Sequence, residues 1–208
     1  MQQSYHDRQV EQFRKFMRWV KSEGGVEGPT QLRTMLQTSQ VGRMDWLKAH
    51  ATGQILEVGT NWGLVLAWVN GHVGVDISPM NIELAKLLDT SREFHIGDAL
   101  SLPFPDQSFD TVMLPEVLEH LDFPDGVDRA LAEARRVTRR VILITLPDGA
   151  TDTEDATNFK HAWLADKTSV QHIVDVLERT SMDCWHGRRD YGGGHSFVLI
   201  RAMEVRNA

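Results

Sequence analysis

Short apolar runs alternate with amphipathic stretches through the middle of the chain. The runs are rich in β-branched residues and predict strands near residues 55–58, 73–77, 93–96, 109–114 and 140–146. Apolar residues three and four positions apart predict helices near residues 64–70, 80–89, 117–121 and 126–138. Because strands alternate with helices, the pattern predicts an α/β fold of the Rossmann-like kind, with a mostly parallel sheet and helices on both faces.

The amino-terminal part of the chain carries two further helical patterns ahead of the first strand. One covers residues 5–20, and the second starts with Thr30 as its cap and runs towards Leu47. The Gly- and Pro-containing residues 24–29 separate them. We expect these helices to cover the ligand site or to pack on the sheet.

The carboxyl-terminal part predicts a different ending for the sheet. Residues 150–166 are polar and irregular and predict a loop over the carboxyl edge of the sheet, and residues 168–180 predict an amphipathic helix. Two strands follow, near residues 182–188 and 196–203. Their short glycine-rich connection makes them an antiparallel hairpin, which brings the predicted sheet to seven strands.

Residues 54–69, QILEVGTNWGLVLAWV, join an apolar run, a glycine-bracketed turn and a helical pattern. Gly59 and Gly63 relieve the steric limits on such a turn. A strand–turn–helix unit brings backbone N–H groups to the carboxyl edge of a sheet, where α/β proteins bind ligands. The G-x-G-x-x-G pattern of a dinucleotide site is not met, because Asn61 stands at the second glycine and Trp62 follows it.

The turn resembles instead the first motif of the class I S-adenosylmethionine-dependent methyltransferases, in the methyltransferase type 11-like small-molecule group. That motif is an acid followed by G-x-G-x-G, and it is matched by Glu57, Gly59, Asn61 and Gly63. Asparagine tolerates left-handed backbone better than most residues, so the turn can form. The resemblance implies S-adenosylmethionine as cofactor, bound by these residues and Thr60. Glu57 either orients the turn or reaches the cofactor's amino group through water.

Two further strand-and-acid units extend the resemblance to roughly residues 54–147. Asp76 ends the second strand, where an acid can accept hydrogen bonds from a ribose diol. The resemblance implies that Asp76 binds the ribose hydroxyls and that Ile77 lies in the same cofactor site. Asp98 and Ala99 resemble the pair that contacts the adenine ring.

The residues after the fourth predicted strand are the candidates for chemistry. The resemblance implies that the backbone near Pro115 lies beside the methionine part of the cofactor. If the chain becomes helical at Glu116, then Glu116 and His120 lie four apart and share one face, which makes them the candidate catalytic residues, with His120 as base. The alternative is that they brace the adjoining loop. His161 and Trp163 either contact the acceptor or anchor the predicted loop.

Composition narrows the class of protein. The 208 residues suit one domain, with a helical cap over residues 1–50 and a cofactor-binding core over residues 51–208. A net charge of −7 without a basic face argues against a nucleic-acid partner. The single cysteine, the polar amino terminus and the absence of a long apolar run favour a cytoplasmic protein without a membrane span. The nine scattered histidines predict no metal site, and the oligomeric state stays open.

These observations predict an S-adenosylmethionine-dependent methyltransferase. The acceptor atom is O, N or C of a small or medium-sized molecule, and the amphipathic first helix leaves a lipid-like acceptor open. Two alternatives remain, an NAD-dependent reductase and a non-catalytic cofactor-binding partner subunit. The predicted hairpin favours the methyltransferase, because a dinucleotide dehydrogenase normally continues with parallel crossovers.

Overall fold

The structure is a computed structural model that describes residues 38–148, 167–190 and 196–204. The helix predicted at residues 5–20, the start of the second predicted helix and the loop predicted at residues 150–166 lie outside these ranges.

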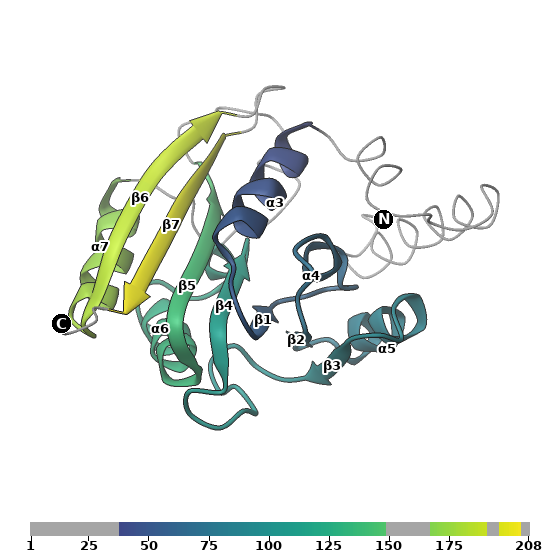
Figure 1. Cartoon of the computed structure of the whole chain (residues 1–208). Coiled ribbons are helices and arrows are strands. Elements are labelled where there is room, and N and C mark those ends of the chain that lie inside the picture. The colour runs from purple at the N-terminus through teal and green to yellow at the C-terminus, as the bar shows by residue number, and fades with distance from the viewer. Residues whose placement is uncertain (1–37, 149–166, 191–195, 205–208) are drawn as a thin grey trace, which may run out of the picture. The chain divides into compact units, whose positions relative to one another are not determined.

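Seven strands form one sheet in the order β3-β2-β1-β4-β5-β7-β6 (Figure 1). Strands β1 to β5 pair in parallel, whereas β7 pairs antiparallel with both β5 and β6. The predicted mostly parallel sheet with a closing hairpin is therefore confirmed. The strands are β1 (Ile55–Val58), β2 (Val73–Asp76), β3 (Glu93–Ile96), β4 (Phe109–Pro115), β5 (Thr138–Pro147), β6 (Met182–Asp190) and β7 (Ser196–Glu204).

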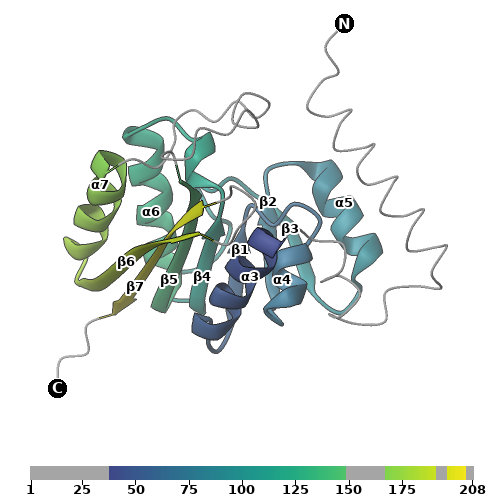
Figure 2. The ribbon, with the colours of Figure 1, turned by 90° about the horizontal axis from the view of Figure 1, so that it is seen from above.

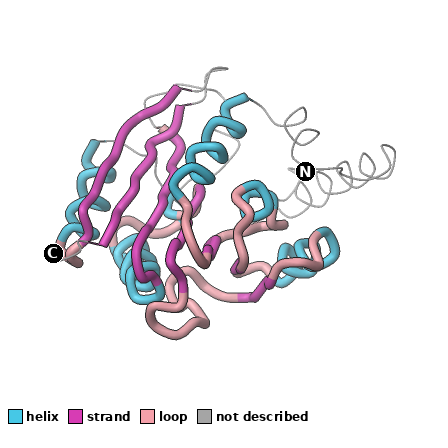
Figure 3. Tube along the Cα trace, viewed as in Figure 1, coloured by secondary structure: helices cyan, strands magenta, loops and turns pink. Residues whose placement is uncertain are grey.

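The described helices follow the predicted alternation with the strands (Figure 3). They are α3 (Thr38–His50), α4 (Leu64–Trp68), α5 (Pro79–Leu88), α6 (Asp125–Val137) and α7 (Lys167–Glu178). The helix predicted at residues 117–121 is instead a three-residue 3-10 turn, η1 (Leu118–His120). None of the described helices is both long and apolar enough to cross a membrane.

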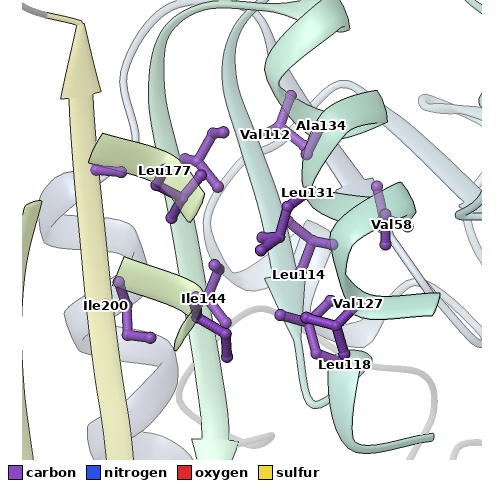
Figure 4. Packing of buried hydrophobic residues seen from close by; sticks show 14 of the residues in the cluster. Val58, Val112, Leu114, Leu118, Val127, Leu131, Ala134, Ile144, Leu177 and Ile200 are labelled. Carbon is purple, nitrogen blue, oxygen red and sulfur yellow. The ribbon is translucent and has the colours of Figure 1, made fainter. Parts of the chain in front are cut away.

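The two faces of the sheet carry different helices, with α6 and α7 on one side and α3 and α4 on the other (Figure 2). Neighbouring residues of β4 show this alternation, because successive side chains of a strand point to opposite faces. Leu114 belongs to one buried cluster with Leu131 of α6 and Leu177 of α7 (Figure 4). Met113 packs with Leu47 of α3 in a second cluster. Both faces of the sheet are thus covered by apolar packing.

The sequence of α6 explains its place on the sheet. Its buried residues recur three and four positions apart, as a helix with one apolar face requires: Val127, Ala130, Leu131, Ala134 and Val137. Acidic residues occupy its first turn and basic residues its last, which complements the helix dipole.

Truncating the centre of this face should destabilise the fold. We expect Leu131→Ala to lower the free energy of unfolding by about 2–5 kcal/mol, because Leu131 is 1% exposed and its removal leaves a cavity. Arg129→Ala, on the exposed side of the same helix, is the control and should change stability by less than about 0.5 kcal/mol. Chemical denaturation measures both, and equal losses would contradict the packing described.

Candidate functional site

Every second residue of the turn between β1 and α4 has a positive φ. Gly59, Asn61 and Gly63 all have positive φ, at 70°, 52° and 86°. Asn61 therefore adopts the left-handed geometry expected of a residue that replaces the middle glycine of the motif. The departure from the glycine pattern leaves the turn intact.

Close packing explains why glycine stands at both ends of the turn. A β-carbon at Gly59 would lie 2.5 Å from Cγ2 of Val117, and one at Gly63 would lie 2.9 Å from the ring of Phe94. Val117 follows β4, so the residues after that strand touch the start of the glycine turn. The turn is held between β3 on one side and the segment after β4 on the other.

Asp76 ties this turn to the next strand. It ends β2 and is 8% exposed, and its Oδ2 accepts a hydrogen bond from the backbone N–H of Asn61 at 2.8 Å. Its Oδ1 accepts from the N–H of Ser78 at 2.9 Å and from Nδ2 of Asn81 at 3.2 Å. A carboxylate has about four lone-pair sites, so Asp76 can still accept a hydrogen bond from a ligand hydroxyl.

The start of α5 supports the same carboxylate. Ser78 caps this helix by accepting a hydrogen bond from the N–H of Asn81, and Pro79 follows at the first helical position. Ile77, between Asp76 and the cap, is 69% exposed and offers bare apolar surface beside the carboxylate. The end of β2 thus combines a held acid with an apolar contact.

Glu57 supports the turn from inside the protein. It is 1% exposed and accepts a hydrogen bond from the Thr60 hydroxyl at 2.8 Å. The hydroxyl and methyl of Thr60 lie over Gly74 of β2, where a β-carbon would come within 2.8 Å of both. Burial raises the pKa of Glu57 from 4.5 to about 8, although the bonds from Thr60 and the backbone of Leu66 oppose the shift. Of its two predicted roles, these contacts favour orientation of the turn.

Asp98 and Ala99 follow β3, beside β2. Oδ1 of Asp98 accepts the backbone N–H of Leu100 at 2.9 Å, and its carbonyl accepts that of Ser101 at 3.0 Å. Gly97 donates to the Asp76 carbonyl at 3.0 Å, which joins this loop to the end of β2. The acids predicted on three strands therefore follow one another along β1, β2 and β3, with Glu57 turned into the protein.

The predicted shared face of Glu116 and His120 is wrong. Pro115 ends β4, and Glu116 has a φ of 56°, which no right-handed helix contains. The 3-10 turn starts only at Leu118, so Glu116 lies outside it, whereas His120 ends it and is exposed. Glu116 instead forms an ion pair with Arg43 of α3, at 3.1 Å. The backbone explains the difference, because the N–H of Glu116 still donates to the Thr145 carbonyl of β5, at 2.8 Å, where a helix would need a bond within the segment.

Glu119 and Arg43 are buried charged residues that the sequence did not single out. Glu119 is fully buried, and neither of its carboxyl oxygens has a hydrogen-bond partner among the described residues. Burial raises the pKa of Glu119 well above its ordinary value, and the charge of Glu116 adds to the shift. Nothing in the E-V-L-E-H-L run marks which glutamate faces inward, and a single arginine in a helical pattern carries no motif.

His161 and Trp163, expected to contact the acceptor or to anchor the predicted loop, lie outside the described residues.

Solved structures share this fold. A methyltransferase from Thermotoga maritima, described as S-adenosylmethionine-dependent and as a possible histamine N-methyltransferase, has a TM-score of 0.63 and 17% identity, over 95% of this chain and 99% of that one. Magnesium protoporphyrin IX methyltransferase from Synechocystis was solved with S-adenosylhomocysteine bound. It has a TM-score of 0.63 and 15% identity, over 92% of this chain and 94% of that one. The fold is thus that of the class I methyltransferases.

The sequence comparisons agree with the fold. Residues 56–142 match the methyltransferase domain family. Methyltransferase GfsG of Streptomyces halstedii is 25% identical over 66% of this chain and 55% of its own length. The demethylmenaquinone methyltransferase of a Roseiflexus species is 36% identical over 42% of this chain and 39% of its own length. Over these residues the chain is similar to S-adenosylmethionine-dependent methyltransferases, and it spans about half or less of the length of these curated relatives.

A side chain at Gly59 should prevent ligand binding at the turn. We expect Gly59→Val to weaken binding of S-adenosylhomocysteine at least roughly tenfold, because valine is strained at positive φ and would meet Val117. Isothermal titration calorimetry measures the affinity. Asn70→Val is the matched control, since it places valine at another positive φ, 57°, at the end of α4 away from the turn. Equal weakening by both variants would contradict the role of the turn.

Burial of Glu57 should make stability depend on pH. The folded protein holds the Glu57 proton more tightly than the unfolded chain. The stabilisation that results is complete below about pH 4.5 and is lost as the pH rises through about 8. Glu57→Gln resembles the protonated acid and should remove this dependence.

The stability of Glu57→Gln relative to wild type should therefore rise between pH 5 and 8, by up to ~1.4 kcal/mol per pH unit. Urea denaturation across this range measures the difference. Glu83→Gln, on the exposed side of α5, controls for the loss of a charge. A constant difference between Glu57→Gln and wild type would show that the buried carboxyl does not titrate in this way.

Proposed function

We propose that this protein transfers the methyl group of S-adenosylmethionine to an O, N or C atom of a small or medium-sized organic acceptor. The observation that carries the proposal is the hydrogen bond of 2.8 Å between the Asn61 N–H and the Asp76 carboxylate. It joins a glycine turn to an acid at the carboxyl edge of the sheet, which is where open α/β sheets bind nucleoside-like ligands.

The residues at this edge fit such a cofactor. The turn would lie against the cofactor through Gly59, Thr60, Asn61 and Gly63, with Glu57 behind it as support. Asp76 has lone pairs left for the ribose hydroxyls, and Ile77 offers apolar surface beside it. Asp98 and Ala99 would contact the adenine ring, and the backbone at Pro115 would lie beside the methionine part.

The protein itself needs to carry out little covalent chemistry. S-adenosylmethionine, when bound, supplies a methyl group already activated by a cationic sulfur. The chain's residues hold the acceptor in line with that methyl and exclude water. A hydroxyl or protonated amine acceptor also loses a proton, and His120, exposed directly after η1, remains the candidate base. Glu116 is assigned to hold Arg43 instead of assisting His120.

The relatives support a small organic acceptor without identifying it. One is an ajmaline N-methyltransferase from Rauvolfia serpentina and another a demethylmenaquinone methyltransferase, so their names point to different acceptors. A lipid-like acceptor is included in the proposal. The single cysteine and the net charge of −7 support a cytoplasmic protein that does not act on nucleic acid.

The strand order of the sheet argues against a dinucleotide-dependent reductase. That class usually has the parallel order 3-2-1-4-5-6, whereas here β7 lies antiparallel between β5 and β6. A non-catalytic cofactor-binding subunit would share this fold, and turnover separates it from an enzyme.

Titration with S-adenosylhomocysteine and with NAD tests the cofactor. We expect wild type to bind S-adenosylhomocysteine and not NAD, and Asp76→Ala to bind it at least roughly tenfold more weakly, because a charge-assisted hydrogen bond is lost. Asp122→Ala, exposed after η1, is the matched control. Preference for NAD, or an Asp76→Ala variant with full affinity, would refute this assignment of the site.

Incubation with methyl-labelled S-adenosylmethionine and a cell extract tests the reaction. Labelled small-molecule products that depend on wild type, and that Gly59→Val does not form, are the expected result. Cofactor binding without any labelled product would leave the non-catalytic subunit as the function.

A further inference from the structure

Helix α3 places a buried arginine at the carboxyl ends of β4 and β5. The side chain of Arg43 is only 7% exposed. Its Nη1 pairs with Oε1 of Glu116 at 3.1 Å and donates to Oγ1 of Thr145 at 3.4 Å. Its Cζ lies 5.3 Å from the centre of the Phe197 ring, which belongs to β7. Contacts from three strands and their loops thus hold the guanidinium in one orientation.

The Nε group of this guanidinium lacks a hydrogen-bond partner among the described residues. Both polar contacts from the described residues go to Nη1, and Nε is buried without an acceptor among those residues. A buried N–H without a partner is costly, and more so on a charged group. Arginine binds carboxylates through two parallel hydrogen bonds, and Nε together with Nη2 forms one of the edges suited to this geometry.

The position of Arg43 relates it to the ligand site. Burial raises the pKa values of both Glu57 and Glu119, and in each case the positive charge of Arg43 opposes the shift. Arg43 is therefore within electrostatic reach of the acid behind the glycine turn and of the turn after β4. These two segments bracket the position expected for the transferring methyl.

The local charges favour an anionic ligand. Glu57 and Glu119 are buried, and burial favours their neutral forms. Glu116 is the ion-pair partner, and its side chain is 34% exposed, so solvent weakens its compensation of the buried cation. An anionic group beside Nε would satisfy this buried donor and would add to the weakened compensation from Glu116.

We propose that Arg43 is a carboxylate-binding residue of the ligand site, with Glu116 and Thr145 as the residues that orient it. The carboxylate belongs either to the methionine end of the cofactor or to the methyl acceptor. This inference rests on the proposed function, because it places the carboxylate on a ligand of the methyl-transfer site.

Two ligands that differ in one group test the cofactor as the source. Wild type, Arg43→Gln and the control Arg139→Gln are titrated with S-adenosylhomocysteine and with its decarboxylated form, which keeps the amine. Arg139 pairs with Asp110 at the other edge of the sheet, at 3.2 Å. If Arg43 binds the cofactor, wild type and Arg139→Gln prefer the carboxylate form by about 10- to 100-fold, and Arg43→Gln loses this preference. Unchanged affinity of Arg43→Gln for the decarboxylated form shows that the variant is folded.

A different result is expected if the carboxylate belongs to the methyl acceptor. Arg43→Gln would then keep the wild-type preference between the two ligands. In the labelled-extract assay, it would form fewer of the products that an anion-exchange resin retains than wild type or Arg139→Gln.

Failure of the Arg43 proposal can be distinguished from failure of the proposed function. If Arg43→Gln changes neither the ligand preference nor the acidic products, the carboxylate assignment is overturned while the proposed function stands. If wild type binds neither ligand, the proposed function itself fails.

Discussion

The carboxylate of Asp76 organises the edge of the sheet on which the ligand site depends. It accepts hydrogen bonds from the glycine turn, from the backbone after β2 and from the first turn of α5. Hydrogen bonds to an ionised group contribute about 1.5–3 kcal/mol each. The turn needs this support, because Asn61 takes a left-handed conformation that only glycine adopts without cost. One side chain thus holds the turn and, in the function proposed, binds the ligand as well.

The site has two sides that meet at Gly59. On one side, the ends of β1, β2 and β3 carry Glu57, Asp76 and Asp98 in strand order. On the other, α3, β4 and β5 contribute Arg43, Glu116 and Thr145. Val117 of the second side packs against Gly59 of the first, where no side chain could stand. A shift in the segment after β4 would therefore be transmitted directly to the glycine turn.

The sequence predicted the sheet well because its signals are local. Each strand is a short apolar run, each connection carries its own helical period, and the hairpin follows from the closeness of its two strands. The placement of the three acids was also predictable, since each lies within two residues of the end of its strand, and parallel strands bring their carboxyl ends to one edge. Asn61 could be accepted in the turn because its backbone preference is a property of the residue itself.

The side formed by α3, β4 and β5 could not be predicted in the same way. The helix predicted over residues 116–120 rested on spacing alone, whereas Glu116 has a positive φ, its backbone N–H bonds to β5 and its side chain pairs with a residue far away in sequence. The contact of Arg43 with Thr145 spans 102 positions, so no local pattern reveals it. The burial of Glu119 likewise depends on the packing of the segment after β4. Long-range polar contacts, unlike strands, leave no periodic signal.

A crystal structure of the protein with S-adenosylhomocysteine bound tests the central claim most directly. The account predicts that the ribose hydroxyls lie within hydrogen-bond distance of the Asp76 carboxylate, while the Asn61 N–H still donates to the same group. A nucleoside bound elsewhere, or an Asp76 carboxylate that holds the turn without touching the ribose, would contradict it.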